Sequence, residues 1–425
     1  MSRNKDVFTP ADVLLPSGIA PEIWSVIACD QFSSERDYWE RVRARINGAP
    51  STLNLIIPEA YLDEIEEEKE ILKICAAMDD YVQRGLLREI KDSFVYVERT
   101  QPDGRVRRGL IGAVDLEEYD FSGGEAAILA SEGTVLDRLP PRIRIRRTAR
   151  FELPHIMTFI NDRDDAVIGP LAEKAAGLPL LYDFKLMEGG GHIRGMRVTG
   201  SDSDSVMSAM RALHGNNRTL MVMGDGNHSL AAAKAYWDEI KQSISRAGRE
   251  NHPARRALLE VNNVYDPAIT FEAINRVIFG VEPAELVSGL EKAMPGGNDY
   301  NLRWTARGQR GDIGVSADCI GDMLTVLQTF MDDYIKRTGC CIDYIHGADT
   351  VEELTKKENC LGLILPAMDK SELFATVASR GVFPKKSFSV GHARDKRYYL
   401  ECRSITDNRM ESPLAAKSAG VHTPV

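Results

Sequence analysis

Residues 219–237 read TLMVMGDGNHSLAAAKAYW. The apolar run 220–223 predicts a buried strand, the glycines after it predict a tight turn, and the Ala-rich part predicts a helix. Glycine in such a turn lets the backbone adopt positive φ and approach a ligand closely. Asn227 or Ser229 can cap the helix, and the first N–H groups of a helix form a site for an anion.

Polar side chains crowd the turn between this strand and this helix. Asp225 and His228 stand at its mouth, where an acid or a base is useful. Gly226, Asn227 and Ser229 are candidates to contact a phosphate. A strand–turn–helix connection without chemistry is the alternative, because glycine turns before helices are common. Four polar residue types within five positions favour a functional site over a purely structural turn.

Composition places the chain among ordinary globular proteins and excludes several classes. The 425 residues are 43% hydrophobic and 27% charged, and this length predicts two domains or one large domain with insertions. The pattern of elements changes after residue 281, which divides the chain into 1–280 and 281–425. A net charge of −10 without a basic stripe argues against a nucleic-acid partner. The start lacks the apolar core of a signal peptide, and no run of 18 apolar residues indicates a membrane span.

Seven cysteines, an odd number with no C-x-x-C pair, fit reduced thiols and a cytoplasmic location. Adjacent Cys340 and Cys341 are interpreted as packing residues, with redox sensitivity as the alternative. The sequence contains no Cys/His metal cluster, so no metal-ligating residues are predicted. Nor does it contain a P-loop, a dinucleotide fingerprint or a nucleophile elbow.

The order of elements predicts an α/β or α+β fold with a mixed sheet. Residues 58–90 read as one amphipathic helical stretch, and a hairpin around 102–104 follows. Apolar strands flank Asp266-Pro267, and the glycines at 189–191 read as a hairpin turn. Beyond residue 281, helices and short strands alternate into a C-terminal α+β region.

A second informative stretch spans residues 130–160. Arg142, Arg144 and Arg146 alternate with isoleucines, so a strand would place all three guanidinium groups on one face. Such a row requires anions, either a phosphate-bearing ligand or carboxylates. We favour phosphate for Arg142 and carboxylates for Arg146. His155 lies among apolar neighbours and is interpreted as a core histidine.

Several of these motifs resemble one family. DGNHSLAAAK is similar to the DGHHR-type motif of the DUF1015 family (domain of unknown function), with Asn227 and Ser229 in place of a His and an Arg. ACDQFSSERDYWE at 28–40 resembles the family's ACDQ signature, and similarity extends over essentially the whole chain. The family motif in turn resembles the phosphate-binding helix start of the ParB/sulfiredoxin-like fold, which includes free-serine kinases.

This resemblance implies a ParB/sulfiredoxin-like core and roles for particular residues. Glu132 and Thr134 match a His-Glu-x-Thr segment, and Glu132 inherits the role of base on a substrate hydroxyl. A solvent-facing loop glutamate is the alternative. Asp30, Gln31, Ser33 and Thr134 are implied to face the substrate, and a helix cap with an Asx turn is the alternative for the first three. Since Ser229 replaces the Arg of the family motif, Arg276 is the candidate to supply the missing positive charge.

The implied activity is phosphoryl transfer to or from a small hydroxyl metabolite, as in a serine kinase or a phosphoserine phosphatase. Glu132, Asp225 and His228 are the candidate catalytic residues, while Asp225 assists or positions Mg²⁺. Mg²⁺ with a nucleotide or pyrophosphate is the implied cofactor, and the only implied partner is a small phosphate-bearing ligand. The alternative is a non-catalytic, nucleotide-dependent switch of the kind that ParB relatives can be.

Overall fold

A computed structural model describes residues 6–406 except 123, 137–138 and 217. Its larger unit is built on an eleven-stranded sheet in the order β10-β11-β4-β5-β13-β9-β12-β7-β6, with β1 on β5 and β2 on β4. The strands are β1 (Phe8–Thr9), β2 (Ala11–Pro16), β4 (Leu87–Thr100), β5 (Val106–Asp115), β6 (Tyr119–Asp120), β7 (Ile128–Leu129), β9 (Met157–Ile160), β10 (Leu180–Lys185), β11 (His192–Val198), β12 (Met221–Asp225) and β13 (Arg256–Asn263).

This sheet is mixed and covered on both faces. The pairs β12–β7, β13–β9 and β6–β7 are parallel, whereas β4–β5 and β12–β9 are antiparallel. Successive residues of a strand point to opposite faces. Phe94 and Tyr96 accordingly join one hydrophobic core, while Val95 and Val97 join another. A strand buried on both faces explains why this segment is apolar without alternation.

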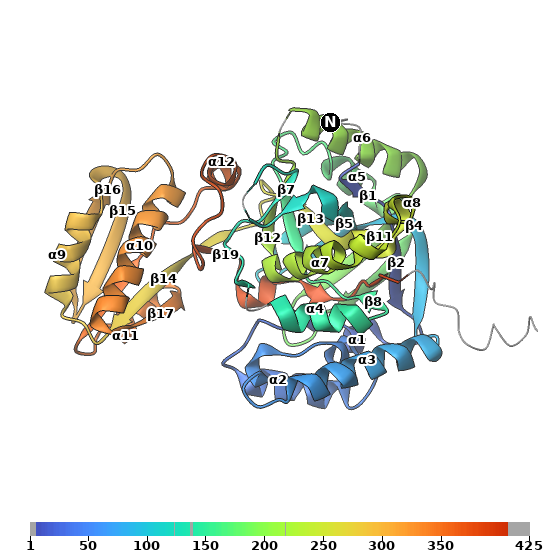
Figure 1. Cartoon of the computed structure of the whole chain (residues 1–425), viewed down its shortest axis with the longest axis horizontal. Helices are drawn as coiled ribbons and strands as arrows, with labels where there is room; N and C mark the ends of the chain where they lie inside the picture. The colour runs from blue at the N-terminus through green and yellow to red at the C-terminus, as the bar shows by residue number, and fades with distance from the viewer. Residues whose placement is uncertain (1–5, 123, 137–138, 217, 407–425) are drawn as a thin grey trace, which may run out of the picture.

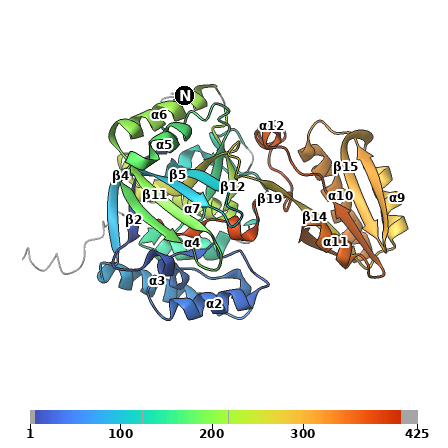
Figure 2. The same ribbon diagram turned by 180° about the vertical axis from the view of Figure 1, so that it is seen from behind.

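Helices form the layers on these faces, as Figures 1 and 2 show. They are α1 (Pro21–Trp24), α2 (Arg36–Ile46), α3 (Glu67–Gln83), α4 (Leu139–Thr148), α5 (Gly169–Lys174), α6 (Gly200–Asn216), α7 (Asn227–Ile240) and α8 (Arg246–Asn251). α4 packs on α7 through Leu139, Ala231 and Ala232. The small alanine side chains allow this close approach. Among the described residues, no helix is both long and apolar enough to cross a membrane.

The smaller unit has a six-stranded sheet, in the order β16-β15-β18-β14-β17 with β19 also on β14. Its strands are β14 (Phe271–Phe279), β15 (Gly296–Ala306), β16 (Gln309–Val315), β17 (Cys341–His346), β18 (Cys360–Ile364) and β19 (Phe388–Val390). Its helices are α9 (Pro283–Ala293), α10 (Ile320–Thr338), α11 (Ala348–Leu354) and α12 (Lys370–Arg380). Sheet membership thus changes between β13 and β14, earlier than the predicted boundary at 280.

After β19 the chain returns to the larger unit, so residues 281–425 do not form one continuous region. β20 (Tyr398–Tyr399) pairs with β3 (Val26–Ile27), and β21 (Arg403–Ser404) pairs with β8 (Phe151–Glu152). We call residues 391–406 the return segment. Buried ion pairs hold it on the larger unit, including Arg397–Glu260 at 3.4 Å and Arg403–Glu152 at 2.7 Å. The return segment brings two polar side chains to the motif that opens α7.

Several predicted elements differ from the observed ones. The arginine stretch forms α4 and not a strand, because its double proline suits the first turn of a helix and its isoleucines pack inward. The stretch 58–90 splits into α3 and the start of β4. The strand–turn–helix at 219–237, the hairpin at 102–104 and the turn at 189–191 are confirmed.

Candidate functional site

The site is organised by the junction of β12 and α7. β12 ends at Asp225, and Gly226 is the N-cap of α7 with φ of 79°. A Cβ at Gly226 would lie 3.0 Å from Ile156 Cα, so both the backbone angle and the space require glycine. Since the N-cap is glycine, neither Asn227 nor Ser229 is the capping residue that the sequence predicted. The first turn of α7 therefore begins without a side-chain cap.

Asp225 lies in a half-closed, charged environment. Its Oδ1 accepts the Gly226 N–H at 2.7 Å, and its Oδ2 lies 3.2 Å from Lys396 Nζ of the return segment. Burial raises the pKa of the Asp225 carboxyl, but the charges of Lys396 and His155 outweigh it and hold the pKa below the ordinary 3.8. The Asp225 carboxylate is therefore ionised at neutral pH. No aligned hydrogen bond from a described residue reaches the buried Oδ2.

Three potential metal ligands converge at this carboxylate. Side-chain ligand atoms of Asp30, His155 and Asp225 all lie within 4.8 Å of one another. His155 Nδ1 shares a 3.0 Å hydrogen bond with Tyr399 Oη, which leaves Nε2 for a ligand. When Nδ1 donates in that bond, Nε2 presents the lone pair that a metal needs. Two carboxylates and one imidazole, with Asp225 Oδ2 lacking an aligned hydrogen bond, fit a divalent cation.

His155 was interpreted as a core histidine, and it is indeed 7% exposed. The structure nevertheless places it beside two carboxylates. The wall behind it holds Tyr399, whose Oη donates to Cys29 Sγ at 3.2 Å. Burial and the nearby Asp30 raise the pKa of the Cys29 thiol to about 12. Cys29 is therefore a neutral thiol at physiological pH and not a nucleophile.

The segment 131–135 lies along the first turn of α7. Asn227 Nδ2 donates to Ser131 Oγ at 3.3 Å, and the Val135 N–H donates to His228 Nε2 at 3.3 Å. The two motifs that the sequence singled out are thus neighbours in space. Glu132 lies between Ser131 and Val135 in the chain, and its shared pocket with Asp225 stays a prediction. A direct role for Glu132 and His228 in one reaction stays a prediction.

Glu132 connects the two units. Its carboxylate accepts the backbone N–H groups of Lys386 at 3.3 Å and Ser387 at 3.2 Å, both in the approach to β19. Burial raises the pKa of the Glu132 carboxyl, although these N–H groups act against that rise. The alternative of a solvent-facing loop glutamate is wrong, because the carboxylate is enclosed between the two units.

Arg276 lies on the smaller unit's side of Glu132. It is 1% exposed in β14, and its guanidinium lies 5.2 Å from the centre of the Tyr344 ring. Burial lowers the pKa of Arg276 to about 10, while Tyr344 and Glu132 act to raise it. The charged Arg276 guanidinium thus interacts with the Glu132 carboxylate and with the Tyr344 ring. The proposed phosphate contact of Arg276 stays a prediction.

Positive charge gathers where the two units meet. Partial burial lowers the pKa of His346 in β17, and the nearby charges of Lys396, Lys386 and His392 lower it further. Lys386 and His392 are exposed, whereas Lys396 is buried beside Asp225. Lys386 and Lys396 thus bring positive charge to this region.

A cavity of about 450 Å³ lies behind the Tyr399–His155 wall. Ser229 and Arg142 contribute to its lining, together with residues of α3, α4 and the loop before Glu59. Arg142 lies 3.3 Å from Glu59, and Arg146 lies 2.7 Å from Glu152. The expected carboxylate partner of Arg146 is confirmed, and Arg142 has one as well. Arg144 pairs with Glu67, also a carboxylate.

The remaining predicted substrate residues differ in their surroundings. Gln31 donates to Asp30 Oδ1 at 3.1 Å and so positions that carboxylate. Ser33 is exposed in the following loop. Thr134 Oγ1 is buried without a hydrogen-bond partner among the described residues, which makes it available to a ligand. Sequence reasoning missed Lys396, Tyr399 and Cys29, and only the family-like ACDQ segment pointed to the last of them.

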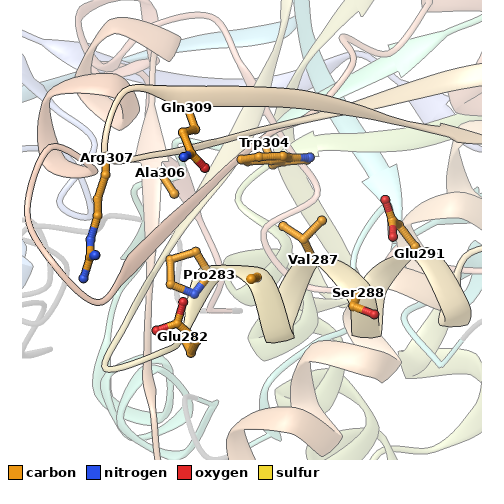
Figure 3. A pocket seen from close by; sticks show the side chains of 10 residues that line it. Glu282, Pro283, Val287, Ser288, Glu291, Trp304, Ala306, Arg307 and Gln309 are labelled. Atoms are coloured by element: carbon orange, nitrogen blue, oxygen red, sulfur yellow. The ribbon is translucent and has the colours of Figure 1, made fainter.

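A separate cavity of about 400 Å³ lies in the smaller unit between α9 and the β15–β16 hairpin (Figure 3). Trp304 and Val287 face each other across it, and Glu282 and Arg307 lie at one end. It contains none of the predicted site residues. The convergence of charged groups makes the β12–α7 junction the candidate site.

Taken together, the fold is a mixed α/β structure with a large mixed sheet, and the candidate site lies at the start of a helix. The chain belongs to the family described as Protein of unknown function (DUF1015), which it matches over residues 16–404. No curated protein matches the chain.

Three solved structures show how far the likeness to known folds extends. SbnI with a C-terminal truncation, from Staphylococcus aureus, has 8% identity and a TM-score of 0.38, covering 72% of this chain and 94% of that chain. A free serine kinase in complex with AMP has 12% identity and a TM-score of 0.35, covering 69% and 90%. A conserved hypothetical protein from Pyrococcus furiosus has 12% identity and a TM-score of 0.34, covering 67% and 92%.

Proposed function

We propose that this protein is a phosphoryl-transfer enzyme acting on a small hydroxyl compound. One observation carries the proposal: Asp225, Asp30 and His155 converge beside Lys396 at the point where β12 ends and α7 begins. A triad of metal-ligand type, a buried lysine and a helix start are together the elements that stabilise a transferring phosphoryl group. The two Asp residues and His155 would hold the divalent cation, which supplies positive charge against phosphate oxygens when bound.

The chain's own residues have distinct roles in this proposal. Lys396 keeps Asp225 ionised and adds a fixed positive charge at the site. Gly226 and Asn227 bring the start of α7 against the phosphate. Glu132 is the proposed base, and burial raises the pKa of its carboxyl, which makes the carboxylate a better proton acceptor. Three backbone N–H groups, from Lys386, Ser387 and Phe388, act on this carboxylate, and a carboxylate offers about four lone-pair sites, so one can still take a proton.

A nucleotide or pyrophosphate is the proposed donor, and Mg²⁺ is the proposed metal. Serine and phosphoserine are the first acceptors to test, because the family motif resembles that of free-serine kinases. A non-catalytic, nucleotide-dependent switch is the second candidate. One observation favours it: Glu132 of the larger unit is bound to backbone groups near β19 of the smaller unit. A ligand that engages this contact would alter how the two units are held.

The first experiment is a thermal-shift screen against ATP, ADP, AMP, pyrophosphate, serine and phosphoserine, each with and without Mg²⁺. A ligand that binds only the native state raises the melting temperature. Donors that bind are then tested for phosphate transfer and release. Binding without turnover supports the switch, and no stabilisation by any phosphate compound would contradict both candidates.

Asp225→Asn and Asp238→Asn form a matched pair for that screen. Asp238 lies on the same helix, α7, where it pairs with Lys234 at 3.0 Å, away from the junction with β12. We expect Asp225→Asn to abolish the metal-dependent part of the shift. Asp238→Asn should leave it unchanged.

A further inference from the structure

The cavity behind His155 is mostly apolar although it adjoins the charged site. It lies between the larger unit's α3 and α4 and strand β8, and Figure 1 shows these helices stacked beneath α7. Its apolar lining includes Leu55, Ile57, Met78, Ile145, Leu153 and Ala232. A volume of about 450 Å³ falls in the range of pockets that enclose small organic ligands.

One wall of this cavity is the back of the candidate site. Cys29, His155, Tyr399 and Ser229 line it, and His155 is also one of the three potential metal ligands. A molecule in the cavity would thus have a polar end at His155 and Tyr399 and the rest of its surface against hydrocarbon. That is the arrangement needed to place a hydroxyl beside the site and to anchor the body that carries it.

The charged residues around the cavity are already paired with each other. Arg142 lies 3.3 Å from Glu59, and Arg146 and Arg403 both lie 2.7 Å from Glu152. Since these opposite charges compensate locally, a zwitterion gains little from them. A molecule as small as serine would also leave most of the apolar walls of the cavity without contact.

We infer that the acceptor is a hydroxyl compound with an apolar body, which occupies the cavity between α3 and α4 and turns its hydroxyl toward the wall that Cys29, His155, Tyr399 and Ser229 form. That the guest is the acceptor substrate rests on the proposed function. Its binding in the cavity does not, because the apolar walls need neither metal nor nucleotide.

The test is isothermal titration of the full chain with linear 1-alkanols from ethanol to octanol, and with serine, without metal or nucleotide. We expect affinity to rise by about fourfold for each added methylene until the cavity is filled. The heat-capacity change should become more negative along the series. A flat series, or serine binding more tightly than octanol, would overturn the inference.

Ile145→Trp should fill the cavity and lower octanol affinity at least tenfold. Ile143→Trp is the matched control on the same helix, because Ile143 packs in the cluster with Leu139 and does not line the cavity. Unchanged octanol affinity in Ile145→Trp also contradicts the inference. If Ile145→Trp melts well below the native protein, Leu153→Trp replaces it under the same criterion. Alkanol binding without phosphate-ligand binding would refute the proposed function alone.

Discussion

Replacing Lys396 by methionine separates the electrostatics of the site from its shape. Methionine keeps a long, unbranched side chain and removes the ammonium that lies 3.2 Å from Asp225 Oδ2. The two side chains are 9% and 14% exposed, so solvent screens the pair only weakly. The variant leaves the Asp225 carboxylate buried without its strongest favourable charge.

Breaking a buried ion pair on one side costs about 3–5 kcal/mol, and the residual exposure of Asp225 points to the lower end, about 3 kcal/mol. Urea unfolding of the native protein and of Lys396→Met measures this loss. Lys385→Met, at an exposed lysine near β19, is the control and should change stability by less than about 0.5 kcal/mol. Adding Asp225→Asn to Lys396→Met should recover part of the loss.

The pH dependence of the free energy of unfolding tests the same variant in a second way. A lowered pKa means that the Asp225 ion pair contributes stability above the ordinary pKa of 3.8, and that this contribution is lost as the pH falls through the still lower folded pKa. The difference in stability between the native protein and Lys396→Met should therefore shrink in acid. A loss below about 1 kcal/mol at pH 7, or a difference that does not depend on pH, would refute the reasoning.

Three further predictions concern Glu132 and the cysteines. Glu132→Gln should lower turnover by roughly two to four orders of magnitude with ligand affinity within a few-fold, and single-turnover rates on folded protein measure it. Since the folded pKa of Glu132 is raised, its contribution to stability is present below 4.5 and lost as pH rises, so unfolding curves of native and Glu132→Gln protein should diverge with pH. Exposed Cys341 should react with iodoacetamide before buried Cys340 and neutral Cys29, as peptide mapping would show.

The junction at 219–237 could be predicted from the sequence because its signals are local. An apolar run, a glycine at positive φ and an alanine-rich helix each act within a few residues. The arginine stretch was assigned wrongly because an alternating pattern over few residues also fits a helix whose isoleucines face different neighbours. Cys341, predicted to be a packing residue, is exposed in β17.

The other half of the site depends on contacts that no local pattern encodes. Lys396 and Tyr399 reach it because β20 pairs with β3 across most of the chain length. His155 has the burial of a core residue, so its neighbours alone could not distinguish packing from ligand binding. Only the three-dimensional structure shows that His155 lies close to Asp30 and Asp225.

The most direct test of the proposed site is Mn²⁺ binding, with Mn²⁺ as a paramagnetic stand-in for Mg²⁺. Electron paramagnetic resonance of free Mn²⁺ is recorded during titration of the native chain and of Asp225→Asn, with and without ADP. We predict one Mn²⁺ per native chain, bound more tightly when ADP is present, and at least tenfold weaker binding in Asp225→Asn. Equal Mn²⁺ binding by both proteins, or none by either with ADP present, would contradict a metal-dependent phosphate site at Asp30, His155 and Asp225.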